Sequence, residues 1–467
     1  MCSYKLWCYK NTEVSTIPSM TRAKKSAYQL HIQKRSLITV FLILFLLFCT
    51  ANVVIYDFGM IKKLMSPAKN HTRYPTMVWY TRQLIKPLQS TITCYEGDRC
   101  NHSKVFNCSV YHNLKQTVPH DPEAYLFYGY DLNRFPLPRN PKTIWGLFYD
   151  ESPKLKPMMM FEKALNLFNF SMTFSRHSDV PLLFSLLLTP YINSLEYYVT
   201  TSVKKNVYKN YAPIVFFQQN CATLTEREAF VEELQKYIDI DSYGPCLNNK
   251  DLPTKILQSS EMLDGRLLKT FLARYRFQIS IENAVCTDYV TEKLWRSLEI
   301  GVVPIYFGSP LIRDWLPNNK SAILVEDFRS PKLLSEYLHY LLKNDTAYEE
   351  HLEHKTLRLV SNQRLLDLIK KRYTLHESCE EPPEKKFLCL ICERIHAKNS
   401  TRVNIVTKKH YDCPVPPKSA LTQNALDPNS TWMMSLDKCK SKLDNLYTEI
   451  NDSDKTPRVS ATSWYRW

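Results

Sequence analysis

The sequence predicts an α/β protein with two Rossmann-like halves, each built on a parallel sheet, behind one hydrophobic segment near the amino terminus. Short runs of apolar, β-branched and aromatic residues recur between residues 124 and 325 and alternate with helical patterns. Strands of a parallel sheet that is covered on both faces read as nearly continuous apolar runs of this kind. The chain of 467 residues is long enough for two or three domains.

The hydrophobic segment spans residues 37–56 and contains no charged residue. A run of this length can cross a hydrocarbon core of ~30 Å. Seven Lys or Arg and a single acid lie within residues 1–36, an imbalance that favours a cytosolic amino terminus. No small-residue cleavage site follows at once, so we expect an uncleaved anchor. The prediction is a cytosolic tail (1–36), a transmembrane signal-anchor (37–56) and a polar stem (57–72).

The first half is expected over residues 73–205, with strands at residues 124–129, 144–149 and 172–174. A polar patch around Cys94, Cys100 and Cys108 is expected to lack strands and to be cross-linked or glycosylated. The lysine-rich residues 203–210 are interpreted as the linker to the second half.

The second half is expected over residues 206–355, with strands at residues 213–217, 277–281, 302–306 and 322–325. Thr225 with Glu228 predicts a capping box, followed by an apolar helix face of Phe230, Leu234, Tyr237 and Ile238. Ser330 and Pro331 predict the start of another helix, with proline at its first position and Leu334, Tyr337, Leu338 and Leu341 on the buried side.

Residues 356–467 are interpreted as a cysteine-containing extension, whose last fifty residues we expect to be poorly ordered. Cys389 and Cys392 are spaced as Cys-x-x-Cys. A structural disulfide region is the main interpretation, and a zinc site or a redox motif are the alternatives.

Fourteen cysteines fit an oxidising compartment. Eleven lie beyond the hydrophobic segment, and an odd number leaves at least one thiol free or paired between chains. Acceptor sequences for N-glycosylation also point to a secretory lumen. They occur at Asn70, Asn101, Asn107, Asn169, Asn319, Asn344, Asn399, Asn429 and Asn451.

The formal net charge of +15 does not indicate nucleic-acid binding. Beyond residue 36 the chain holds 54 basic and 45 acidic residues, and it has no dense basic block with interleaved aromatic residues. A mildly basic lumenal surface is the simpler interpretation.

The most informative segment is residues 277–310, which reads as strand, polar loop, helix and strand. Glu282, Asn283, Tyr289, Glu292 and Lys293 lie where the first strand ends and the helix begins. Ligands of open α/β sheets bind beyond the carboxyl ends of the strands, and anions favour helix amino termini. A lysine beside acid, amide and tyrosine side chains suits a nucleotide sugar.

The same segment resembles the donor-binding signature of the α1,3-fucosyltransferases, glycosyltransferase family ten. A second block agrees, because DESP at residues 150–153 and FNFSMTFSRHSDV at residues 168–180 are similar to two further elements of that family in the same order. The match covers about half of the chain. Residues 241–253 and 314–325 resemble a divergent animal subgroup, the fucosyltransferase ten/eleven type.

The resemblance implies the two-domain GT-B architecture, with the acceptor on the first half and GDP-fucose on the second, across a facing cleft. It identifies Glu151 as the catalytic base. Donor-binding roles are implied for Arg227, Asn283, Tyr289, Glu292 and Lys293. Arg227 could instead form an ordinary surface pair with Glu228, and Glu282 could be a ligand for donor hydroxyls or a buried structural acid. Arg176 and His177 are possible donor or acceptor contacts, and Asp179 is expected to shape the acceptor cleft.

We expect no metal or other cofactor. Asp239 and Asp241 have the spacing of a metal-binding Asp-x-Asp motif, but they are interpreted as lying at a helix end before a turn.

The function that the resemblance implies is an inverting transfer of L-fucose from GDP-β-L-fucose, in α-1,3 linkage, to N-acetylglucosamine of a glycoprotein glycan. The alternatives are a protein O-fucosyltransferase that acts on Ser or Thr of folded modules in the endoplasmic reticulum, a non-catalytic lumenal binding protein, and a transferase of another nucleotide sugar. The expected setting is the Golgi membrane, single-pass type II with a lumenal catalytic region, or the endoplasmic reticulum membrane. A homodimer is possible, and no nucleic-acid partner is expected.

Overall fold

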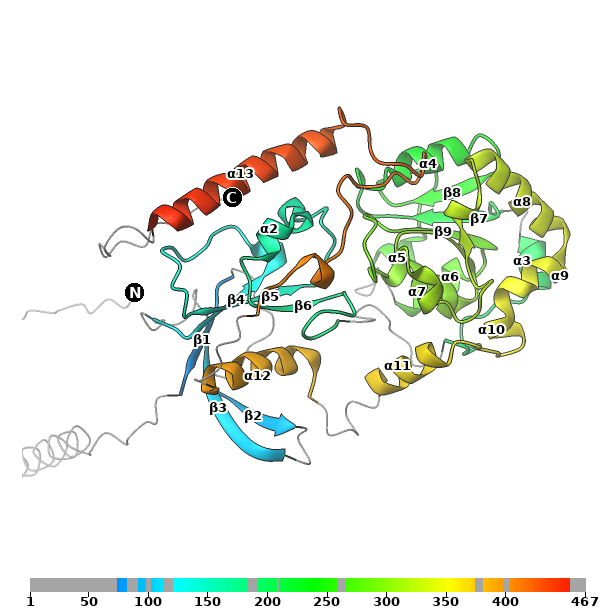
Figure 1. Ribbon diagram of the computed structural model, residues 1–467. Coiled ribbons are helices and arrows are strands. Elements are labelled where there is room, and N and C mark those ends of the chain that lie inside the picture. Colours follow the sequence, from blue (N-terminus) through cyan, green and yellow to red (C-terminus); the bar gives the residue numbers. More distant parts are fainter. Residues whose placement is uncertain are drawn as a thin grey trace, which may run out of the picture. The chain divides into compact units, whose positions relative to one another are not determined.

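The computed structural model describes residues 74–81, 91–97, 102–112, 121–182, 192–207, 210–258, 265–373, 381–397 and 404–453 (Figure 1). The predicted tail, anchor and stem lie outside these residues. No helix in the described part of the chain is both long and apolar enough to cross a membrane.

The first half is built on a six-stranded sheet in the order β2-β3-β1-β4-β5-β6. All neighbouring strands are parallel except β2 and β3, which form an antiparallel pair. The strands are β1 (Thr76–Trp79), β2 (Thr91–Gly97), β3 (His102–His112), β4 (Ala124–Tyr128), β5 (Ile144–Tyr149) and β6 (Phe170–Thr173).

Both faces of this sheet are covered by helices from the far end of the chain. Leu126 and Phe148 pack with α12 (Pro383–His396) on one face. Phe127 and its register partner Leu147, each one residue from the first pair, pack with α13 (Thr431–Ser453) on the other. Residues 383–396 and 431–453 of the predicted extension are therefore part of the first half's core. Residues 431–453 form a helix where poor order was expected.

The second half is a five-stranded, wholly parallel sheet in the order β11-β10-β9-β7-β8. Helices α4 and α8 cover one face, and α6 and α7 cover the other. The strands are β7 (Ile214–Phe217), β8 (Ile240–Tyr243), β9 (Phe277–Ile281), β10 (Val303–Phe307) and β11 (Ile323–Leu324). The covering helices are α4 (Arg227–Leu234), α6 (Arg266–Leu272), α7 (Glu292–Ile300) and α8 (Pro331–Lys343).

Shorter elements connect these layers. The α-helices are α2 (Glu162–Leu165), α3 (Thr201–Val207), α5 (Thr254–Leu257), α9 (Asp345–Glu349), α10 (Glu353–Thr356) and α11 (Gln363–Tyr373). The 3₁₀ helices are Gly129–Asp131, Pro157–Met160, Ile312–Trp315, Val325–Asp327, Glu350–Leu352 and Lys408–His410.

Each of the seven predicted strands overlaps an observed one, and the prediction of an α/β fold with parallel sheets is confirmed. The patch around Cys94 and Cys108 is not free of strands, since these residues lie in β2 and β3. In β3, the side chains of residues 106–110 alternate between buried and half-buried, and this period of two hides the strand from a search for continuous apolar runs.

The two helix starts of the second half have different outcomes. The prediction at Ser330 is confirmed, because its side chain accepts from the Leu333 amide and Pro331 begins α8. The capping box at Thr225 is wrong, because α4 begins one residue later, from Glu226 at φ 48°. Tyr237 is 38% exposed, whereas Phe230, Leu234 and Ile238 are buried as expected.

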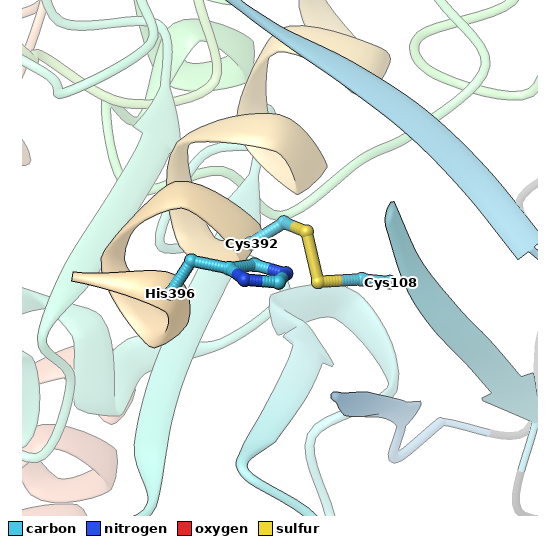
Figure 2. Close-up of side chains that lie close together, drawn as sticks. All are labelled: Cys108, Cys392 and His396. Atoms are coloured by element: carbon cyan, nitrogen blue, oxygen red, sulfur yellow. A yellow bond between two sulfur atoms is a disulfide. The ribbon is translucent and has the colours of Figure 1, made fainter. Parts of the chain in front are cut away.

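Disulfide bonds tie distant parts of the sequence together. They join Cys94 to Cys389, Cys108 to Cys392, Cys221 to Cys246 and Cys286 to Cys413. The structural interpretation of Cys389 and Cys392 is confirmed, since both fasten α12 to the sheet. Figure 2 shows His396 beside the sulfur–sulfur bond of Cys108 and Cys392, so this cluster offers no free thiolate to a metal ion. Cys439 is the free cysteine among the described residues, and Cys100 and Cys379 lie outside them.

Candidate active site

The loop between β9 and α7, residues 282–291, carries most of the predicted donor-binding residues. Its first residue, Glu282, is fully buried, and its carboxylate accepts hydrogen bonds from the Thr291 amide and hydroxyl, both at 2.7 Å. Thr291 in turn caps α7 by accepting from the Lys293 amide at 3.4 Å. Of the two interpretations of Glu282, this geometry fits the buried structural acid, because both carboxylate oxygens hold the start of the helix.

Glu292 and Lys293 form a charged pair at the start of α7. The Lys293 ammonium lies 3.1 Å from the Glu292 carboxylate, 3.4 Å from that of Glu282, and 2.9 Å from the Thr291 hydroxyl. Burial opposes both charges, but Lys293 and Arg296 outweigh it and hold the pKa of Glu292 at about 2. Likewise, Glu292 and Glu282 overcome burial and raise the pKa of Lys293. The pair is therefore ionised at neutral pH.

Asn283 and Tyr289 complete this loop. The Oδ1 atom of Asn283 is buried and has no hydrogen-bond partner among the described residues. Such an orphaned acceptor is costly in a folded protein unless a ligand or water satisfies it. Tyr289 is buried with its ring 5.0 Å from that of Phe174, and burial followed by the charge of Glu151 raises its pKa well above the usual value. Asn283 thus has an unused acceptor, whereas Tyr289 is part of the core beside Phe174.

Glu151 follows β5 and lies opposite this loop. Burial and then the neighbouring Asp150 raise the pKa of Glu151, while Lys293 opposes them. The Tyr411 hydroxyl donates to the Glu151 carbonyl at 2.8 Å, and the Tyr149 hydroxyl donates to the next carbonyl, that of Ser152, at 2.8 Å. The main chain beside the carboxylate is therefore fixed. A carboxylate with a raised pKa on such a fixed main chain is suited to accept a proton.

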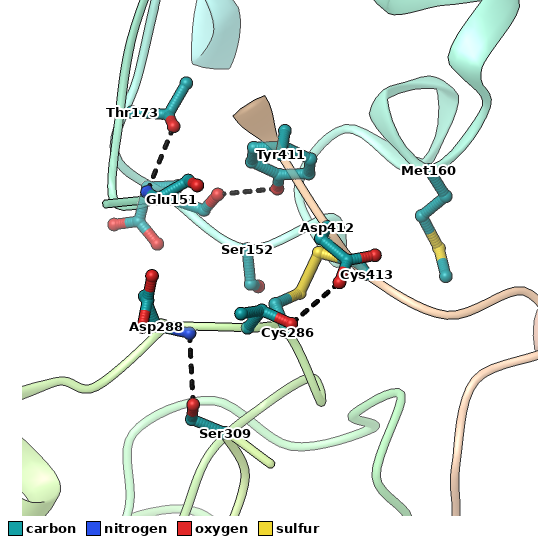
Figure 3. Close-up of a disulfide and its surroundings, with 12 residues drawn as sticks. Glu151, Ser152, Met160, Thr173, Cys286, Asp288, Ser309, Tyr411, Asp412 and Cys413 are labelled. Atoms are coloured by element: carbon teal, nitrogen blue, oxygen red, sulfur yellow. Dashed lines mark hydrogen bonds between the residues drawn. A yellow bond between two sulfur atoms is a disulfide. The ribbon is translucent and has the colours of Figure 1, made fainter. Parts of the chain in front are cut away.

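A segment that sequence reasoning missed, residues 404–426, connects these two loops. We call it the strap. Its Asp412 accepts from the Thr287 amide and hydroxyl at 2.8 and 2.7 Å, and its Cys413 is bonded to Cys286 (Figure 3). Figure 3 also shows Tyr411 reaching Glu151. The strap thus touches two loops within three consecutive residues: the loop after β5 that carries Glu151, here called the base loop, and residues 282–291, here called the donor loop.

Arg227 is not a surface residue. Only 1% of it is exposed, and its guanidinium donates to the carbonyls of Ile281, at 3.2 Å, and Asn220, and lies 3.3 Å from the Glu228 carboxylate. The interpretation as a surface pair is therefore corrected: the pair with Glu228 exists, but it is buried. The Arg227 side chain holds together the carboxyl ends of β7 and β9.

Arg176 also forms an internal contact. It binds Asp288 through two nitrogen atoms, at 2.6 and 2.9 Å, contacts Asp314 at 2.7 Å, and lies 5.0 Å from the Trp315 ring. It therefore joins the first half to the donor loop. His177 is exposed, and Asp179 holds Ser171 through its amide and hydroxyl.

The Asp239–Asp241 spacing does not lie at a helix end. Asp241 is in β8, and its carboxylate is engaged by Lys250 at 2.8 Å and by the Tyr275 hydroxyl at 2.7 Å. Residue 239 directly precedes that strand, so the motif lies at the amino end of the sheet, away from Glu151 and Lys293.

The predicted glycosylation sites differ in their surroundings. Asn169 uses both ends of its amide internally, accepting from the Trp145 amide at 2.8 Å and donating to the Asn404 carbonyl at 3.1 Å. Asn319, Asn429 and Asn451 are exposed. Asn107 and Asn344 are half-buried, and Asn70, Asn101 and Asn399 lie outside the described residues.

Two family profiles match the chain. One is described as glycosyltransferase family 10 (fucosyltransferase), C-terminal, and covers residues 206–410. The other is described as fucosyltransferase, N-terminal, and covers residues 72–185. Together they include Glu151, the donor loop and the first part of the strap.

Curated relatives are similar over most of the described chain. A chicken (Gallus gallus) protein named GDP-fucose protein O-fucosyltransferase 3 is 40% identical over 69% of this chain and 66% of its own length. The human (Homo sapiens) protein of that name is 36% identical over 79% and 78%. A Drosophila melanogaster protein named alpha-(1,3)-fucosyltransferase B is 41% identical over 68% and 74%. A crystal structure of an alpha1,3-fucosyltransferase with GDP is 16% identical, at a TM-score of 0.40, over 72% of this chain and 93% of that one.

Proposed function

The chain belongs to glycosyltransferase family 10, the fucosyltransferases, and on that premise we propose that it transfers L-fucose from GDP-fucose to a hydroxyl group of a folded protein. The observation that carries the proposal is the pairing of two loops: an ionised Glu292–Lys293 pair beside an orphaned Asn283, and a fixed Glu151 opposite them. The names of the chicken and human relatives support a protein acceptor.

In the proposed reaction, Glu151 accepts the proton of the acceptor hydroxyl as its oxygen attacks the anomeric carbon of fucose. The bond from that carbon to the β-phosphate oxygen breaks, and its electron pair leaves with GDP. Lys293 and the positive end of α7 stabilise the charge on the departing diphosphate. A single base on the face opposite the leaving group gives inversion, as in inverting glycosidases.

The structure changes the part that we assign to two residues. Arg227 donates to two main-chain carbonyls and to Glu228, so we propose that it holds the carboxyl ends of β7 and β9 in place rather than binding phosphate. Glu282 holds Thr291 and Lys293, so we propose a structural role for it. Asn283, Tyr289 and Glu292 remain the proposed contacts of the nucleotide sugar.

A second acceptor is supported by the fly relative, whose name specifies an α-1,3 linkage. In that case the reaction would add fucose to O3 of N-acetylglucosamine in a glycoprotein glycan, within the same GT-B arrangement. The chemistry at Glu151 would be the same, so the two proposals differ only in the acceptor.

The test uses the full-length protein with radiolabelled GDP-fucose and a panel of folded disulfide-bonded protein modules and free glycans. The Glu151→Gln variant should bind GDP-fucose as the wild type does and should lose transfer by about 10²–10⁴-fold. Substantial transfer by this variant would remove Glu151 from its role. If the label appears on glycans alone, the acceptor is N-acetylglucosamine of a glycan and the proposal of a protein acceptor is wrong. Binding without transfer to any acceptor, even by the wild type, would support the non-catalytic alternative.

Two further expectations accompany this mechanism. Because burial raises the pKa of Glu151, kcat/KM should begin to fall on the acid side at a higher pH than for an exposed glutamate. Because Lys293 and α7 are proposed to stabilise the diphosphate, transfer should persist in excess EDTA. A complete loss of transfer that added Mg²⁺ or Mn²⁺ restores would contradict the metal-free proposal. We further propose a type II membrane protein whose catalytic region lies in the lumen of the endoplasmic reticulum or Golgi.

A further inference from the structure

Lys154 is a cation on the base loop that extends to the second half. It lies three residues after Glu151, and its ammonium donates to the carbonyl of Cys221 at 2.7 Å. Cys221 belongs to the loop that follows β7, and its disulfide with Cys246 fixes that loop beyond β8. The side chain thus spans from the loop of the proposed base to the carboxyl ends of the other sheet.

Three cations converge at these strand ends. Arg227 donates to the carbonyl of Asn220, directly before the Cys221 carbonyl that Lys154 contacts. Arg227 also donates to the carbonyl of Ile281, the residue before Glu282, and Glu282 lies 3.4 Å from the Lys293 ammonium.

The three cations differ in their ion pairs within the part of the chain that the structure describes. Arg227 lies beside Glu228, and Lys293 lies between Glu292 and Glu282. Within the described residues Lys154 forms no ion pair, and its bonded partner is a neutral carbonyl. Burial, followed by the charge of Arg227, lowers the pKa of Lys154; the carboxylate of Glu228 opposes this shift, and Lys293 adds to it. An arriving anion would relieve that repulsion.

We propose that Lys154 is a donor-binding residue whose ammonium contacts the diphosphate of GDP-fucose from the first half, opposite Lys293. This inference rests on the proposed function. A phosphate oxygen carries a negative charge and the Cys221 carbonyl does not, so the Lys154 ammonium gains more from the diphosphate than from the carbonyl that it contacts now. Because Lys154 and Glu151 share one loop, the donor would then help to hold the base loop.

The test measures the binding of GDP and of guanosine to the full-length protein by calorimetry. The Lys154→Gln variant keeps a donor for the Cys221 carbonyl but removes the charge, and Lys154→Arg keeps the charge. We expect Lys154→Gln to weaken GDP binding by tenfold to a hundredfold and guanosine binding by less than twofold. Lys154→Arg should stay within about fivefold of the wild type for both probes.

The matched control is Lys163→Gln, which removes an exposed lysine of the same half that pairs with Asp444 at 2.6 Å. It should leave both affinities unchanged. Unchanged GDP affinity in Lys154→Gln, or an equal loss for guanosine, would overturn the inference. Should Lys154→Gln fail to fold, Lys154→Met and Lys154→Arg with the same two probes decide between charge and packing. A wild-type protein that binds no GDP would instead overturn the proposed function.

Discussion

Two helices of the second half, α4 and α7, begin with the same local pattern but position its cation differently. Thr225-Glu226-Arg227 follows β7, and Thr291-Glu292-Lys293 follows β9. At α7 the threonine is the N-cap and the helix starts at the glutamate. At α4 the glutamate is the N-cap, in a left-handed conformation, and the helix starts at the arginine.

The difference follows from what each threonine contacts. Thr291 is held by both carboxylate oxygens of Glu282, which leaves its own oxygen to cap α7. The Thr225 hydroxyl donates to the Glu282 carbonyl at 2.7 Å and does not cap α4. Lys293 consequently stays between two acidic side chains, whereas Arg227 contacts two main-chain carbonyls and Glu228. One local pattern therefore yields a cation paired with two acids in one place and a bracing cation, which joins two strand ends, in the other.

The largest expected effect is on stability and concerns the bracing cation. Arg227→Met removes the partner of Glu228 and of two main-chain carbonyls, one of them buried, so the free energy of unfolding should fall by about 3–5 kcal/mol. Lys293→Met should cost less, because burial already raises the pKa of Glu282 and favours its neutral form once the lysine is gone. Urea unfolding followed by circular dichroism measures both. Equal losses of unfolding free energy in the two variants would contradict the structural difference between Arg227 and Lys293.

The next effect is on GDP binding, where Lys293→Met should cause the larger loss and Arg227→Met the smaller one. Lys293→Met should weaken GDP binding by roughly 1.5–3 kcal/mol, the range of a charge-assisted hydrogen bond. Arg227→Met, measured at a temperature where it is folded, should bind GDP within about fivefold of the wild type. Calorimetric titration decides. A larger loss for Arg227→Met would return the arginine to the phosphate site.

A smaller effect separates the two threonines. Thr291→Val removes an N-cap and a hydroxyl bonded to Glu282, so the free energy of unfolding should fall by about 1–2 kcal/mol. Thr225→Val removes one bond to a main-chain carbonyl and should cost about 1 kcal/mol or less. The GDP affinity should drop only for Thr291→Val, because only this residue positions Lys293. A loss of GDP binding in Thr225→Val would contradict that assignment.

The smallest expected effect is the only one that could increase the free energy of unfolding. Glu226 adopts φ 48°, a region that glycine enters without steric cost. Glu226→Gly should therefore leave the free energy of unfolding unchanged or raise it by about 0.5 kcal/mol. Glu292→Gly, at the first position of α7, should instead lower it by about 1 kcal/mol from helix propensity alone. Thermal melts of both variants test this difference: the melting temperature should stay the same or rise for Glu226→Gly and should fall for Glu292→Gly.

Much of the second half could be predicted because its strands are short apolar runs and its site residues are adjacent in sequence. Residues 277–281 and the loop that follows them lie as the sequence predicts. The strand β8 was missed because its sequence, Ile-Asp-Ser-Tyr, is polar. Its buried Asp241 is satisfied by Lys250 and Tyr275, a partnership that no local pattern reveals.

The first half was harder to predict because its core is completed from the far end of the chain. Phe387 and Ile391 of α12, and Leu443 and Leu446 of α13, cover its two faces. The contact of Tyr411 with Glu151 joins residues 260 positions apart. Residues 404–426 look like a polar tail in sequence, and only tertiary contacts make them part of the site. The contact of Lys154 with the Cys221 carbonyl could likewise not be predicted, since it joins residues 67 positions apart.

The strap has a consequence for how the protein is made. Both sheets leave the ribosome before residue 404, so a nascent chain holds every strand of the fold while the partners of Glu151, Cys286 and Thr287 are still being synthesised. Activity should therefore appear only at the end of translation, and a shortened transcript that stops before this point would yield an enzyme that binds poorly and turns over little.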